Sequence, residues 1–155
     1  MVEAMQNGVY AGYPVVDVKV NVIDGSFHDV DSSEIAFKLA AIGCLKNGFL
    51  KGKPVLLEPY MSLEVICPEE YVSAIVGNIC SRRGRVLGME FKANQKIISA
   101  EAPLAEMFGY MTTFRSLSSG RASGSMQFLK YMQVPQEIAQ KVIEEKKKKK
   151  EEEGK

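Results

Sequence analysis

Valine occupies every second position from residue 16 to residue 22, and polar residues stand between these valines. This alternation has the period of a β-strand with one buried face, so it predicts a strand over residues 15–23. A turn signal follows, which predicts a loop over residues 24–31. Beyond the loop, apolar residues recur at helical spacing and predict a helix over residues 32–49, with Asp31 as its cap.

The pattern after Pro54 predicts a complete small domain. Its expected elements are a strand around residues 61–67, a helix from Pro68 to Gly84, strands near 85–91 and 96–102, a helix from Pro103 that ends at residues 118–120, and a strand over about 121–131. The order β-α-β-β-α-β is that of the split β-α-β, ferredoxin-like fold. We therefore expect an α+β protein in which two helices cover one face of an antiparallel sheet.

The chain divides into three expected segments, which are residues 1–52, residues 54–134, and a helix with a charged tail over residues 135–155. Residues 144–155 hold six Lys and five Glu, a composition typical of a solvated helix end. The whole chain has 20 Lys and Arg against 19 Asp and Glu, which argues against a broad basic surface for nucleic acid.

Composition excludes several classes of protein. With 155 residues and 46% hydrophobic residues, the chain can fill a core and is not disordered throughout. No apolar run approaches the roughly 20 residues of a membrane span, and the start shows no secretory signal. Cys44, Cys67 and Cys80 are odd in number and widely spaced, which favours buried thiols in a reducing cytosol.

No catalytic residues and no metal site are predicted. The sequence has no glycine-rich phosphate loop of the P-loop or dinucleotide type. His28 is the single histidine, so no two-histidine metal site can form. Asp29 and Asp31 beside it suggest a general base or a metal site, but a helix cap and an exposed loop histidine explain these residues better.

Arginine is used at few positions. The five arginines form two short clusters near helix ends, at Arg82, Arg83, Arg85, Arg115 and Arg121. They either complement the helix dipoles or contact RNA phosphates, and the sequence leaves both interpretations open. In the expected topology the two clusters lie at opposite ends of the sheet.

Several motifs resemble bacterial elongation factor G. Residues 24–34 (DGSFHDVDSSE) resemble the loop and helix of its fourth domain, as do residues 3–8 and 11–14. Phe27 stands where tyrosine is common in that family. The segments that resemble its fifth domain are LEP at 57–59, SRRG at 81–84, PLAEMFGY at 103–110 and LSSGRA at 117–122. The resemblance extends from about residue 3 to residue 143.

The resemblance implies a carboxy-terminal piece of a cytoplasmic GTP-dependent translocase. Residues 1–52 would be the end of an α/β, ribosomal-protein-like domain whose earlier strands are absent. Residues 15–23 would then lack pairing partners, so we expect residues 1–50 to be partly loosened or to recruit another chain. GTP and magnesium would bind to amino-terminal domains of the parent, and this piece would need no cofactor.

The resemblance also implies partners and site residues. The piece would bind rather than catalyse, and it would contact the ribosome, ribosomal RNA, tRNA and mRNA while tRNA and mRNA move. The loop of Gly25, Ser26, Phe27, His28 and Asp29 would lie at the tip that reaches the decoding site. The five arginines would be the candidates for contact with ribosomal RNA.

Two other interpretations of the residues are open. The second segment is consistent with an autonomous ferredoxin-like module that binds RNA or a small ligand. An acylphosphatase-like enzyme shares the element order, but it needs a phosphate-binding loop after the first strand. The acidic Glu69 and Glu70 occupy that position here and would repel phosphate.

Overall fold

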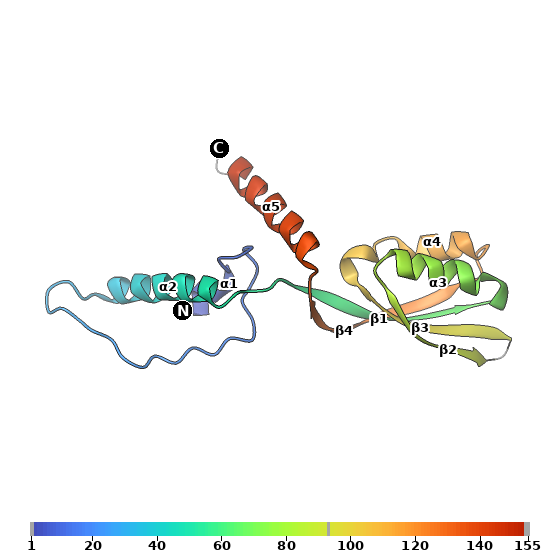
Figure 1. The fold of residues 1–155 in the computed structure, drawn as a ribbon, viewed down its shortest axis with the longest axis horizontal. Coiled ribbons are helices and arrows are strands. Elements are labelled where there is room, and N and C mark those ends of the chain that lie inside the picture. The colour runs from blue at the N-terminus through green and yellow to red at the C-terminus, as the bar shows by residue number, and fades with distance from the viewer. Residues whose placement is uncertain (1, 93, 154–155) are drawn as a thin grey trace. The chain divides into compact units, whose positions relative to one another are not determined.

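A computed structural model describes residues 2–92 and 94–153. The chain forms two compact units (Figure 1). One consists of Leu57–Gln133, which we call the sheet unit, and the other combines Met1–Leu56 with Val134–Lys155, which we call the loop unit.

The sheet unit contains one four-stranded sheet. Its elements are β1 (Leu57–Cys67), the 3-10 turn η1 (Glu69–Tyr71), α3 (Val72–Ser81), β2 (Arg85–Lys92), β3 (Gln95–Pro103), the 3-10 turn η2 (Leu104–Glu106), α4 (Tyr110–Leu117) and β4 (Ser123–Gln133). The strand order is β2-β3-β1-β4, and all neighbouring strands are antiparallel. Both α3 and α4 lie on the same face of the sheet (Figure 1). The predicted ferredoxin-like α+β fold is therefore confirmed.

Alternation along β1 and β3 builds the core. Leu63 and Val65 of β1 are buried, and their partners across the ladder are Ala100 and Ile98 of β3. Phe114 of α4 is fully buried in the same cluster. Burying one such side chain contributes about 1.5–3 kcal/mol, so the alternating residues fix which face of the sheet the helices cover.

The helix predicted from Pro103 is interrupted. The turn η2 ends at Glu106, and α4 begins only at Tyr110. Between them Gly109 has a φ of +70°, a left-handed conformation that breaks the helical hydrogen bonds. Apolar spacing alone did not predict this break, because buried Met107 keeps the helical pattern across it.

Helix α3 ends at Ser81, before the predicted limit at Gly84. Arg83 takes the left-handed conformation, with a φ of +59°, and the amide of Gly84 donates to the Ile79 carbonyl at 2.9 Å. Gly84 is required for space instead, since an added Cβ would lie 2.6 Å from Ile79 Cγ2. The C-terminal turn thus places an arginine where glycine is usual.

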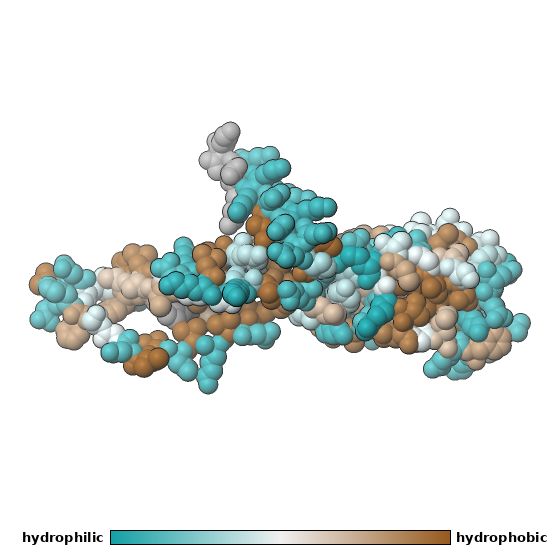
Figure 2. Space-filling model, viewed as in Figure 1, coloured by the Kyte–Doolittle hydropathy of each residue, from teal (hydrophilic) through white to brown (hydrophobic). Residues whose placement is uncertain are grey.

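The loop unit contains α1 (Val2–Gln6), α2 (Glu34–Lys51) and α5 (Gln136–Glu153). The predicted strand over residues 15–23 is wrong, because the described chain forms no strand there. A strand needs a hydrogen-bonded neighbour, and side chains such as Val22, which is 81% exposed, have no sheet to cover. Figure 2 shows apolar side chains at the surface of this unit.

Helix α2 confirms the position of the predicted helix but not its cap. Ser33 is the N-cap, and its Oγ accepts a hydrogen bond from the Ala36 amide at 3.2 Å. Asp31 lies in the turn before it. The apolar side chains of α2 that the spacing predicts to be buried are largely exposed, for example Ile35 and Leu39.

The three thiols differ in exposure. Only Cys67 is buried, whereas Cys44 and Cys80 are exposed, so the prediction of three buried thiols is wrong for two of them.

Lys38 of α2 donates to Glu3 of α1 at 2.7 Å, and this hydrogen bond lowers the pKa of Glu3. Within the described residues, no helix has the length and apolar character needed to cross a membrane.

Candidate functional site

The loop over residues 24–31 is exposed and leads directly into α2. Its shape is fixed by short-range hydrogen bonds. The amide of His28 donates to Ser32 Oγ at 2.6 Å, and the amide of Ser32 donates back to the His28 carbonyl at 3.1 Å. At the start of the loop the Gly25 amide donates to Asp24 Oδ1 at 2.7 Å. The loop therefore ends in a hydrogen-bonded turn that lies directly before Ser33, the N-cap of α2.

The His28 side chain points into solvent and is 72% exposed. Its Nδ1 accepts a hydrogen bond from the Val30 amide at 3.4 Å and lies 3.6 Å from Asp31 Oδ2. Ser26, Phe27 and Asp29 are exposed on the same loop. The ring is neither packed among aliphatic groups nor part of a metal cluster, and no group of metal-ligating side chains is found in the described part of the chain.

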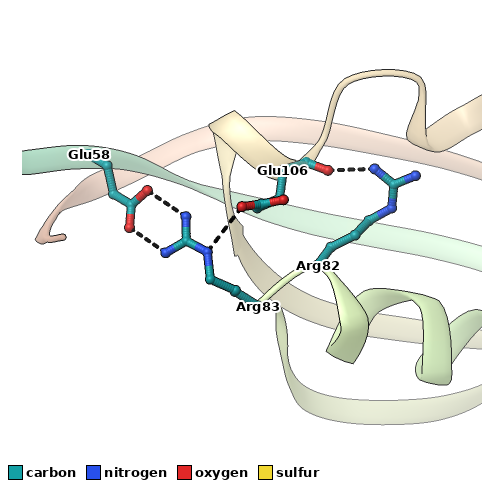
Figure 3. A network of polar contacts seen from close by, with 4 residues as sticks. All are labelled: Glu58, Arg82, Arg83 and Glu106. Atoms are coloured by element: carbon teal, nitrogen blue, oxygen red, sulfur yellow. Dashed lines mark hydrogen bonds and ion pairs between the residues drawn. The ribbon is translucent and has the colours of Figure 1, made fainter. Parts of the chain in front are cut away.

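Arg83 is held by two carboxylates (Figure 3). Its Nη1 and Nη2 donate to the two oxygens of Glu58 at 2.8 and 2.9 Å, and its Nε donates to Glu106 at 3.3 Å. Glu58 lies at the start of β1 and Glu106 ends η2, so this arginine ties together elements that are distant in sequence. The hydrogen bonds to Glu58 raise the pKa of Arg83.

Arg82 is bound only by neutral groups. It donates to Asn78 Oδ1 at 2.9 Å, to Thr113 Oγ1 at 3.2 Å and to the carbonyls of Glu106 and Phe108 (Figure 3 shows the bond to Glu106). Since no carboxylate pairs with Arg82 among the described residues, its positive charge is not neutralised. The side chain of Phe108, on the connection between η2 and α4, is exposed.

Arg85 and Arg121 are both paired with carboxylates. Arg85 donates to Glu101 at 2.7 Å, and Lys130 lies 3.4 Å from the same buried carboxylate. Arg121 donates to Glu70 at 2.8 Å and to the Tyr71 hydroxyl at 2.7 Å. Arg115 is exposed on α4.

The two arginine clusters lie at opposite ends of the sheet, as the topology predicts. Arg83 contacts Glu58 at the start of β1, whereas Arg121 contacts Glu70, just beyond the end of β1. The clusters therefore form two separate spots on the sheet unit.

Comparison with known proteins shows the family. The family description "Elongation factor G, domain IV" matches residues 1–53, and "Elongation factor G C-terminus" matches residues 55–142, more than half of the chain. The chain belongs to the elongation factor G family. Its fold is similar to that of a protein from Thermus thermophilus whose crystal structure is known, with 39% identity and a TM-score of 0.84. That match covers 95% of this chain and 22% of the other chain.

Within this elongation factor G region, the sequence identified the arginines but not their partners. Glu58 and Glu101 are buried carboxylates that neutralise Arg83 and Arg85. A glutamate within an alternating strand is a weak signal for such a partner. Ser32 was also missed, although a serine four residues after a loop residue can hydrogen-bond to its backbone.

Proposed function

We propose that this elongation factor G region is the ribosome-contacting part of a GTP-dependent translocase, where it promotes movement of tRNA and mRNA. The observation that supports this most directly is the exposed, backbone-braced loop with the single histidine, in a chain that matches domain IV and the C-terminus of the family. The region binds rather than catalyses. GTP and magnesium would act in amino-terminal domains of the intact cytoplasmic factor.

The loop would contact the codon–anticodon region of tRNA and mRNA in the decoding site. Ser26, His28 and Asp29 all carry exposed polar groups that can hydrogen-bond to RNA. Because the Ser32 contacts fix the turn directly before α2, the loop would act as a steric guard, and its role requires no proton transfer.

Ribosomal RNA would meet the sheet unit at the two arginine clusters. A charge already paired with a carboxylate offers little to a phosphate, so Arg82 and Arg115 are better candidates than Arg83, Arg85 and Arg121. Such contacts depend on salt, and each phosphate contact contributes about 0.7–0.9 to the slope of log affinity against log salt concentration.

The test is a comparison of translocation and GTP hydrolysis in the intact factor. We expect His28→Ala to slow translocation while GTP hydrolysis on the ribosome persists. Lys46→Ala, which alters an exposed side chain on α2, is the matched control. Unchanged translocation in His28→Ala, or equal slowing in the control, would contradict the proposal.

A further inference from the structure

Two adjacent serines that precede α2 form different hydrogen bonds. Ser33 Oγ accepts from the Ala36 amide and caps the helix. Ser32 Oγ instead accepts from the amide of His28 at 2.6 Å, while its own amide donates to the His28 carbonyl at 3.1 Å. These reciprocal bonds fix both polar backbone groups of His28. The helix does not need Ser32 for its cap, so the hydroxyl of Ser32 serves the loop.

The same turn fixes which nitrogen of His28 faces outward. A neutral imidazole has one donor nitrogen and one acceptor nitrogen. Nδ1 accepts from the Val30 amide at 3.4 Å, and this contact favours the neutral form that carries its hydrogen on Nε2. The side chain is 72% exposed, and no polar contact of Nε2 is found among the described residues.

The charged groups that face the ring do not change this assignment. Asp31 Oδ2 lies 3.6 Å from Nδ1, too far for a hydrogen bond to the neutral ring. An imidazolium ring carries hydrogen on both nitrogens, so Nε2 is a donor in that form as well. The neighbouring Asp29 is exposed on the same loop. Nε2 is thus a donor in both protonation states.

We propose that Ser32 is a positioning residue for His28, and that this turn presents Nε2–H of His28 to an oxygen acceptor on RNA. The proposal rests on the proposed function for the identity of the acceptor, a phosphate or hydroxyl oxygen. Its geometric part rests only on contacts within residues 28–32. A preorganised donor loses little conformational freedom when it binds.

The geometric part is tested by nuclear magnetic resonance of the full chain. A single histidine gives a single imidazole signal set, so the tautomer is measured without assignment ambiguity. We expect the fraction of neutral His28 in the Nε2–H form to be larger than the fraction found for the histidine of a short peptide. We also expect amide exchange of His28 to become about fivefold faster in Ser32→Ala, as loss of one hydrogen bond implies. Ser32→Thr should restore protection, and Ser33→Ala should leave it unchanged.

The functional part is tested by a double-mutant cycle in the intact factor. If Ser32 acts through His28, Ser32→Ala slows translocation in the unaltered factor but adds nothing in His28→Ala. Additive effects, an unprotected His28 amide in the unaltered chain, or a peptide-like tautomer ratio would overturn the inference. If His28→Ala leaves translocation unchanged, the proposed function fails, and the RNA acceptor with it.

Discussion

Replacing Arg83 by methionine tests how strongly one ion pair stabilises the sheet unit. Arg83 donates to both oxygens of Glu58, whose side chain is only 10% exposed. Methionine keeps much of the side-chain volume but leaves that carboxylate buried without a cation. Breaking a buried ion pair in this way costs about 3–5 kcal/mol. Because the Arg83 side chain is 23% exposed, we expect the lower limit, about 3 kcal/mol.

The pKa of Arg83 indicates the pH range in which the ion pair stabilises the folded chain. The pKa of Arg83 is raised, chiefly by its hydrogen bonds to Glu58. Its stabilising contribution is therefore present at neutral pH and is lost on the alkaline side, as the pH rises through the folded value. The deficit of Arg83→Met should thus be measured at neutral pH, where the arginine of the unaltered chain is protonated.

Native-state hydrogen exchange of the β1 and β3 amides is the appropriate assay, because it measures the free energy of opening of the sheet unit alone. A loss of about 3 kcal/mol corresponds to exchange faster by roughly 100-fold. The control is Glu69→Gln, which removes a pair with Lys96 at 3.6 Å in which Glu69 is 71% exposed. That change should cost less than about 1 kcal/mol. An Arg83→Met deficit no larger than that of the control would refute the reasoning.

Two more predictions concern close packing in the sheet unit. Gly84→Ala forces a Cβ to within 2.6 Å of Ile79 Cγ2 and 2.7 Å of the Ile79 carbonyl. We expect a loss of about 1–3 kcal/mol, measured by the same exchange assay, and an unchanged stability would contradict this geometry. Burial raises the pKa of Cys67, whereas Cys44 and Cys80 are exposed. A thiol reagent at neutral pH should therefore add two adducts by mass spectrometry, and a third only in denaturant; three adducts in the native chain would contradict it.

The sequence predicted the sheet unit well, because its elements satisfy several rules together. The alternation around residues 61–67 coincides with the buried positions of β1, and the helical spacing after Pro68 coincides with the buried Ile75 and Ile79 of α3. Neighbouring strands and helices are all present in that part of the chain. Each buried face predicted by the pattern therefore finds a partner.

The same reasoning failed where the described structure places no neighbouring strand beside the alternating residues. Residues 16–22 alternate regularly between valine and polar residues, yet residues 15–23 form no strand in the described structure. The pattern specifies a half-buried strand only in the presence of a neighbouring strand, since backbone pairing supplies its hydrogen bonds. Asp31 failed as the cap for a different reason, because Ser33 is also a good N-cap and lies directly before the helix.

The range of the contacts explains why the loop was easier to locate than the arginine partners. His28 is held by residues two and four positions away, so local sequence contains its whole framework. Arg83 and Arg121 reach partners 25 and 50 positions away, which only the folded sheet brings together. The two candidate contact regions consequently depend on different parts of the structure. Loss of the sheet unit would remove the arginine clusters, whereas the shape of the loop depends on a few residues around Ser32.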